Sequence, residues 1–232
     1  MRQNTILMLL LVTVFAVAGS SAFAAKQRVA CIGNSITAGF GLSHPESDSY
    51  PAVLQQLLGN DYEVGNFGVS ARTLLNKGDL PYMKEPAWRK ARQMNPDIVV
   101  VKLGTNDSKP ENWQYGEGYE SDMQLLVDSL KALGSNPRIL LCTPIPAFKP
   151  TWNINDSVIT HCIIPAIERV AQRNGCEVID LHTLYAAYGG LMQADGIHPA
   201  KEGARKIAEL VCTALLQEKC KGKCCAMCKD KK

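Results

Sequence analysis

Three polar side chains in this sequence have the chemistry needed to hydrolyse an ester. Ser35 carries a hydroxyl group, which becomes an effective nucleophile when a neighbouring base accepts its proton. His198 is the candidate for that base, because an imidazole titrates close to neutral pH. Asp195 lies three residues before His198 and can hold the imidazole in the required tautomer while stabilising its protonated form. These residues predict a serine–histidine–aspartate triad.

Ester hydrolysis also needs hydrogen-bond donors for the negative charge that develops on the carbonyl oxygen. We expect three such donors, which together would form an oxyanion hole. They are the backbone N–H groups of Ser35 and Gly68 and the side-chain amide of Asn106. Gly68 suits this role because a residue without a side chain lets a substrate approach its backbone closely.

The fold must bring these residues together, since they are far apart in the chain. Five short apolar segments are expected as strands, and segments with helical spacing of apolar residues alternate with them. The expected strands are residues 28–32, 62–67, 97–103, 138–142 and 176–181, and the expected helices are residues 49–59, 119–133, 155–174 and 199–216. This alternation predicts an α/β protein with a five-stranded parallel sheet between two helical layers, a three-layer α/β/α sandwich.

Ligands of such parallel sheets bind beyond the carboxyl ends of the strands. Ser35 follows the first expected strand, Gly68 follows the second and Asn106 follows the third. Asp195 and His198 lie beyond the fifth strand, just before the final helix. The proposed site residues therefore share one edge of the sheet.

Four short motifs make the sequence similar to a known family. "GNSITAG" contains Ser35, "NFGVS" contains Gly68, "GTND" contains Asn106 and "DGIHP" contains His198. Over about residues 27–216 the chain resembles the SGNH hydrolases, also called GDSL-type lipases and esterases. The resemblance implies a flavodoxin-like α/β/α fold, a serine nucleophile, the aspartate–histidine pair and the same oxyanion hole. One residue departs from the family pattern, because Asn34 stands where the family usually has aspartate.

Other interpretations of these residues are weaker. The glycines around Ser35 lack the spacing of a phosphate-binding loop. His182, two residues after Asp180, is a rival base at the same edge of the sheet, whereas His44 is expected in a loop and His161 in a helix. Asp107 is expected to stabilise the Asn106 loop through local hydrogen bonds.

Two tryptophans bear on the substrate. Trp113 and Trp152 lie in loops at the expected catalytic edge, where their rings could stack on sugars or pack the loops down. Together with Asn34 they are the candidate substrate-binding residues. Exported members of the family with "KLGTNDSKP" resemble O-acetylesterases that act on sialate or plant polysaccharides, and we expect that activity here. The alternatives are an esterase, lysophospholipase or thioesterase for longer acyl chains, and a carbohydrate-binding protein without activity.

Composition divides the chain into three parts. Residues 1–24 have the charge, apolar run and small-residue cleavage site of a secretory signal peptide, so a secreted or periplasmic bacterial protein is expected, without stable membrane insertion.

Residues 25–218 form the hydrolase domain. The formal net charge of +3 reflects lysines in the tail, residues 219–232, and the domain itself is slightly acidic, which argues against nucleic acid. No cofactor or metal is expected, and the oligomeric state is not predicted.

The nine cysteines fall into two groups. Five are expected to be small, buried apolar residues: Cys31, Cys142, Cys162, Cys176 and Cys212. The other four crowd into the tail: Cys220, Cys224, Cys225 and Cys228. They could form disulfides, bind a soft metal or lie in a disordered segment.

Overall fold

A computed structural model describes residues 25–223 and contains one five-stranded parallel sheet in the order β2-β1-β3-β4-β5. The strands are β1 (Gln27–Gly33), β2 (Tyr62–Gly68), β3 (Ile98–Lys102), β4 (Arg138–Cys142) and β5 (Glu177–Ile179). This order is that of the flavodoxin-like fold. The expected strands are confirmed in number and direction. β5 is shorter than expected, because Asp180 already accepts the Thr183 N–H and begins the next helix.

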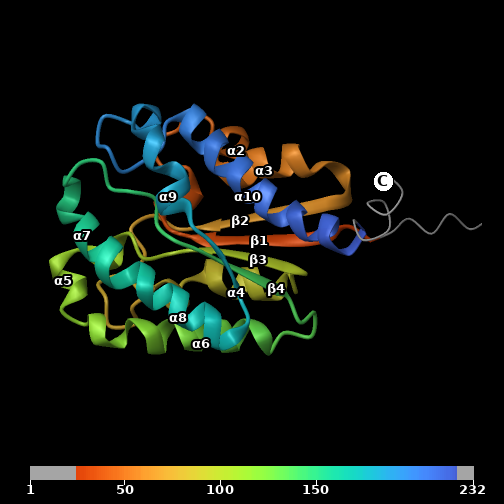
Figure 1. The fold of residues 1–232 in the computed structure, drawn as a ribbon, viewed down its shortest axis with the longest axis horizontal. Helices are drawn as coiled ribbons and strands as arrows, with labels where there is room; N and C mark the ends of the chain where they lie inside the picture. Colours follow the sequence, from red (N-terminus) through yellow and green to blue (C-terminus); the bar gives the residue numbers. More distant parts are fainter. Residues whose placement is uncertain (1–24, 224–232) are drawn as a thin grey trace, which may run out of the picture.

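Helices cover both faces of the sheet (Figure 1). On one face lie α4 (Pro86–Gln93), α6 (Tyr119–Lys131) and α8 (Ile164–Asn174), and on the other lie α3 (Tyr50–Leu58), α9 (Leu181–Tyr185) and α10 (Lys201–Lys223). Short helices occupy the loops: α1 (Ser35–Ala38), α2 (Pro45–Asp48), α5 (Pro110–Trp113) and α7 (Asp156–Val158). The three-layer α/β/α sandwich is therefore confirmed.

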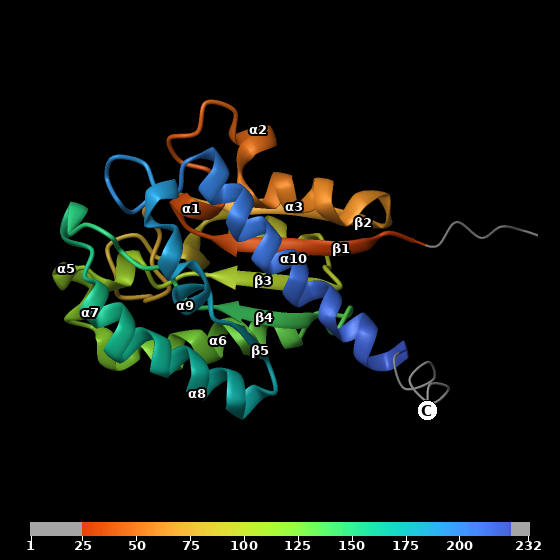
Figure 2. The same cartoon turned by 45° about the horizontal axis from the view of Figure 1, so that its top comes forward.

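β3 shows why the sheet is buried on both sides. Val99 and Val101 pack with α4, α6 and α8, whereas Ile98 and Val100 pack with α3 and α10. Side chains alternate between the two faces of a strand, so a continuous β-branched run suits a strand covered by helices on each side. Figure 2 shows the strands pointing toward the same edge, where α1, α5 and α7 lie.

The helix ends follow the sequence signals in part. α3 begins after Ser49 and ends before Gly59 as expected, although the Ser49 side chain accepts a hydrogen bond from Asn66 at 3.3 Å rather than capping the helix. The expected helix over residues 155–174 is interrupted by a π-helical turn, Ile159–Ile163, just before Pro165. Proline lacks the N–H that a continuous α-helix needs, which explains the changed hydrogen bonding.

The five cysteines before residue 218 are free thiols. Cys31 and Cys142 are buried and Cys176 and Cys212 are half-buried, but Cys162 is exposed, so its expected burial is wrong. The signal peptide and the cysteine-rich end of the tail lie outside the described residues, and those predictions stay predictions. Within residues 25–223, no helix has the length and apolar character needed to cross a membrane.

Lys102 is a charged residue in the core. It extends the face of β3 that carries Ile98 and Val100, and it is 1% exposed. Its ammonium group has no hydrogen-bond partner among the described residues. Burial lowers the pKa of Lys102 from 10.5 to about 8, so keeping the lysine protonated at neutral pH destabilises the fold.

We expect Lys102→Met to raise the free energy of unfolding at pH 7 by roughly 3 kcal/mol, the energy equivalent of lowering the pKa from 10.5 to about 8. Between about pH 8 and pH 10.5 the unfolded chain binds more protons than the folded one, so the free energy of unfolding of the wild type rises with pH. The difference in stability between Lys102→Met and wild type should therefore shrink over this range. Urea unfolding at pH 7 and pH 10 measures both effects. Lys90→Met, on the exposed side of α4, is the control and should have little effect at either pH. A Lys102→Met protein less stable than wild type at pH 7 would contradict this account.

Candidate active site

Ser35 lies in the tight turn between β1 and α1. Asn34 caps α1, because its side-chain Oδ1 accepts the Ile36 N–H at 3.1 Å. Ser35 is therefore the first residue of the helix, where backbone N–H groups have no partner within the helix. Gly33 permits the turn, since a Cβ there would lie 2.1 Å from Thr37 Oγ1. As a result, Ser35 lies at the carboxyl edge of the sheet, directly after β1.

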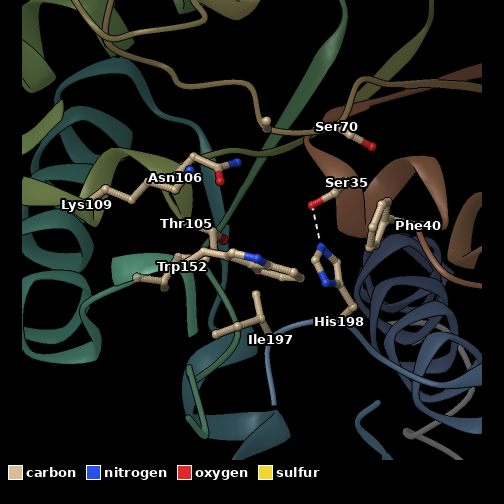
Figure 3. Close-up of a pocket in the computed structure, with 11 residues that line it drawn as sticks. Ser35, Phe40, Ser70, Thr105, Asn106, Lys109, Trp152, Ile197 and His198 are labelled. Carbon is tan, nitrogen blue, oxygen red and sulfur yellow. Dashed lines mark hydrogen bonds between the residues drawn. The ribbon is translucent and has the colours of Figure 1, made fainter. Parts of the chain in front are cut away.

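The three residues predicted as a triad form one hydrogen-bonded relay. His198 Nε2 lies 2.8 Å from Ser35 Oγ, as the dashed line in Figure 3 marks, and His198 Nδ1 lies 2.9 Å from Asp195 Oδ2. Asp195 Oδ1 accepts the N–H groups of Ile197 at 2.7 Å and His198 at 2.8 Å. Burial would raise the pKa of Asp195, but these hydrogen bonds outweigh burial and hold the pKa below its usual value. Asp195 is thus kept ionised beside the imidazole.

Two aromatic rings flank the His198 imidazole. The ring of Phe40 lies 4.6 Å from it and the ring of Trp152 lies 5.2 Å from it, measured between centroids. The rings are themselves in edge contact at 6.3 Å. Phe40 was not among the predicted site residues, although it lies only five residues after Ser35 and could have been expected near it. These contacts restrict the orientation of the imidazole and form a partly apolar wall beside it.

A cavity of about 250 Å³ opens in front of the relay. Ser35 and His198 lie on one side of it, Asn106 and Lys109 on the other, and Trp152 lies between them (Figure 3). Ser70 and Ala71 complete the wall near Ser35. The carboxyl ends of β1, β2 and β3 and the loop before α10 all contribute residues to it, as the sequence predicted.

Gly68 does not supply the expected oxyanion donor. Its N–H donates to Asn66 Oδ1 at 2.9 Å, and it is not on the cavity wall. A Cβ at Gly68 would lie 2.2 Å from the Ala38 backbone nitrogen, so glycine is needed there for the packing of β2 against α1. The prediction for Gly68 is therefore wrong, because its N–H is already used and its missing side chain serves packing.

Ala71 is the backbone donor candidate that replaces Gly68. It lies on the cavity wall, and its N–H finds no acceptor in the described part of the chain. Its φ of +67° is left-handed, a conformation that favours glycine. Ala71 thus holds a strained backbone conformation on the cavity wall. The sequence contained no signal for it, because alanine does not indicate a positive φ.

Asn106 and Ala71 are held together by a network of hydrogen bonds. Asn106 Nδ2 donates to the Arg72 carbonyl at 3.1 Å, which leaves its second amide hydrogen for a ligand. Asp107 accepts the N–H groups of Leu74 at 3.1 Å and Leu75 at 2.8 Å. Asp107 keeps a local bond to its own backbone N–H, as expected, and adds these long-range ones, which join two loops. Burial raises the pKa of Asp107 to about 6, against the effect of these bonds.

We expect Ala71→Gly to raise the free energy of unfolding by about 1 kcal/mol, because glycine adopts a positive φ without strain. Its kcat should stay within a few-fold of wild type, since the backbone N–H is retained. Thermal unfolding and p-nitrophenyl acetate kinetics measure the two effects. Ala87→Gly, in α4, is the control and should lower stability, because glycine weakens a helix. A stability loss at Ala71→Gly equal to that of the control would show that the positive φ is unstrained.

Two of the three candidate substrate-binding residues lie away from the cavity. Asn34 is fully buried and serves as the cap of α1, a role in which an aspartate oxygen would serve equally. Trp113 packs on the core beside the Tyr119 ring, at 5.9 Å between centroids. Both predictions are wrong for that reason. Trp152 does lie on the cavity wall, half exposed and with a left-handed φ of +51°.

The remaining histidines are not part of the relay. His182 Nε2 lies 3.5 Å from Asp156 Oδ1 and 3.4 Å from Thr160 Oγ1, so the rival base is engaged elsewhere. His44 is exposed beside Glu46 and His161 bonds within its own helix, as expected. Among residues 25–223, no group of three or more histidine, cysteine or carboxylate side chains could hold a metal ion.

A serine–histidine–aspartate relay at the carboxyl edge of a parallel sheet is the arrangement by which serine hydrolases form an acyl-enzyme. Residues 31–206 match the GDSL-like lipase/acylhydrolase family. The chain belongs to this family, and its domain is that of a carboxylic ester hydrolase.

Individual relatives agree with this membership. The chain is 53% identical over 205 residues to an acetylxylan esterase of Xylanibacter ruminicola, a match that covers 81% of this chain but 43% of that protein. It is 29% identical to Esterase TesA of Pseudomonas aeruginosa, covering 81% of this chain and 87% of that protein.

Solved structures share the fold. Est24, a carbohydrate acetylesterase from Sinorhizobium meliloti, has a TM-score of 0.67 at 19% identity, covering 83% of this chain and 100% of that one. The acetyl xylan esterase AlAXEase has a TM-score of 0.64 at 23% identity, covering 81% and 99%.

Proposed function

We propose that this protein is a serine O-acetylesterase that removes acetyl groups from carbohydrates. The observation that carries the proposal is the unbroken relay from Ser35 Oγ through His198 to Asp195, which opens into a small cavity that Ala71 and Asn106 also line. A volume of about 250 Å³ suits a short acyl group better than a long chain. The named activity of the Xylanibacter ruminicola relative supports the same substrate class, although the chain spans under half of that protein.

The mechanism has two stages. Ser35 Oγ attacks the ester carbonyl carbon while His198 Nε2 accepts the hydroxyl proton, and Asp195 stabilises the imidazolium. The N–H groups of Ser35 and Ala71 and the Asn106 amide stabilise the oxyanion. As the C–O bond breaks, His198 returns the proton to the sugar oxygen and leaves an acetyl group on Ser35. Water then attacks this acyl-enzyme while His198 accepts its proton, and His198 returns that proton to Ser35 Oγ as acetate leaves.

The aromatic wall supports a carbohydrate substrate. Trp152 is 50% exposed and Phe40 is 48% exposed, so large apolar surfaces face solvent next to the base. Flat aromatic faces suit the C–H faces of sugar rings. Trp152 and Asn153 both have a positive φ, and strain of this kind concentrates at functional sites. Trp152 is therefore the substrate-binding residue that we retain.

Two measurements test the function. Released acetate is measured with acetylated xylan and other acetylated glycans, and kcat/KM is measured for p-nitrophenyl esters from acetate to octanoate. We expect acetate release, and a preference for acetate over octanoate of about tenfold or more, because the small cavity suits a short acyl group better than a long chain. A clear preference for octanoate would instead favour a longer-chain esterase. Glycan binding without acetate release would indicate a non-catalytic carbohydrate-binding protein.

A further inference from the structure

Lys109 contributes a charged side chain to the active-site cavity that the hydrolysis mechanism leaves unused. It follows the 3₁₀ turn Asn106–Ser108, and its carbonyl accepts the N–H groups of Asn112 at 2.9 Å and Trp113 at 2.8 Å. Its backbone is therefore held firmly at the start of α5. Its half-buried side chain lines the cavity opposite Ser35 and His198 (Figure 3).

The charge of Lys109 is not balanced by the protein. No carboxylate among the described residues forms an ion pair with it, whereas Lys201 pairs with Asp48 and Lys206 with Glu209. Asp195 is occupied by His198 and by two backbone N–H groups.

Asp156, the first residue of α7, accepts the Ala147 N–H at 2.7 Å and lies near His182. With Asp195 also engaged, the cavity wall carries a positive charge without a partner. Such a wall favours a ligand with an anionic group.

The position of Trp152 indicates where that anionic group would lie. The oxygen that leaves must be close to His198, which protonates it. A sugar ring stacked on the Trp152 indole then has one edge toward His198 and the opposite edge toward Lys109, because the indole lies between these two residues (Figure 3). The substituent that contacts the Lys109 ammonium group is thus part of the sugar and not of the acetyl group.

We propose that the preferred sugar bears a carboxylate, as uronic and sialic acids do, and that Lys109 pairs with this carboxylate. The inference rests on the proposed function, since it names the kind of carbohydrate that the same site deacetylates. Lys109 is then a specificity residue, with no part in the chemistry at Ser35.

The test compares two substrates that differ in charge alone: a mono-O-acetylated methyl uronoside and its uncharged carboxamide. We expect wild type to have a kcat/KM for the acid about tenfold higher than for the amide, as a charge-assisted contact at a half-buried site provides. Lys109→Met keeps the aliphatic stem and should bring the ratio of kcat/KM for the acid to kcat/KM for the amide close to one. Lys109→Arg keeps the charge and should retain most of the preference. Added salt should lower the wild-type ratio.

Lys149→Met is the matched control. Lys149 is an exposed lysine near the site whose Nζ donates to the Ala194 carbonyl at 2.9 Å, and its removal should leave the ratio near the wild-type value. Thermal unfolding verifies that each variant is folded. A wild-type ratio near one, or an unchanged ratio in Lys109→Met, overturns the inference while leaving the acetylesterase intact. If neither sugar is deacetylated although p-nitrophenyl octanoate is hydrolysed, the proposed function fails and the inference fails with it.

Discussion

Replacing Ser35 with alanine is expected to lower kcat for p-nitrophenyl acetate by about 10⁶-fold, the order found when the nucleophilic serine is removed from a hydrolase with this triad. The hydroxyl is the group that His198 Nε2 contacts at 2.8 Å, and without it no acyl-enzyme forms. Alanine retains the backbone N–H and is well tolerated in the first turn of α1. KM should therefore change little, and the loss should appear in kcat.

Ser70→Ala is the matched control for this prediction. Ser70 also lies on the cavity wall, but it has no hydrogen bond to His198, so its kcat should stay within tenfold of wild type. Mass spectrometry of acid-quenched enzyme should find the acetyl group on the peptide that contains Ser35. A kcat for Ser35→Ala within tenfold of wild type would exclude Ser35 as the nucleophile, and the mechanism with it.

Asp195→Asn is expected to lower kcat by about 10⁴-fold. Asp195 Oδ1 accepts two backbone N–H groups, so an asparagine would keep its oxygen there and turn its NH₂ toward His198 Nδ1. The imidazole would then have to carry its proton on Nε2, and it could no longer accept the Ser35 proton. The fold should survive, because the backbone hydrogen bonds of the Asp195–His198 turn are retained.

Asp180→Asn is the control that separates the two aspartate–histidine pairs. Asp180 caps α9, next to His182, and its replacement should affect stability slightly and kcat within a few-fold. Steady-state kinetics of both variants at neutral pH measure the difference. Loss of activity in Asp180→Asn and not in Asp195→Asn would make His182 the base.

The predictions from sequence succeeded where short-range chemistry decides the structure. The β-branched run of β3 can be buried on both faces in a covered parallel sheet, and the glycine after α3 can end that helix, whatever the rest of the chain does. The position of Ser35 directly after β1 is similarly local, although the sequence analysis did not predict that Asn34 caps the helix that begins there. The resemblance to a family of hydrolases rests on motifs at such strand ends.

The failed predictions concern contacts between segments that are distant in the chain. Gly68 and Ala71 are three residues apart, and which of their N–H groups is free depends on Asn66, on α1 and on the Asp107 bonds to Leu74 and Leu75. Whether a tryptophan faces a substrate or the core depends equally on its neighbours, and Trp113 packs against the Tyr119 ring.

The sequence by itself determined the strands, the layers and the edge at which Ser35, Asn106, Asp195 and His198 would lie, because backbone propensity and apolar spacing act over a few residues. The tertiary structure alone decided the donor at Ala71, the aromatic wall of Phe40 and Trp152, and the unpaired charges of Lys102 and Lys109. These features depend on which hydrogen-bond and packing partners the folded chain leaves free, and a local sequence pattern does not predict contacts between distant segments.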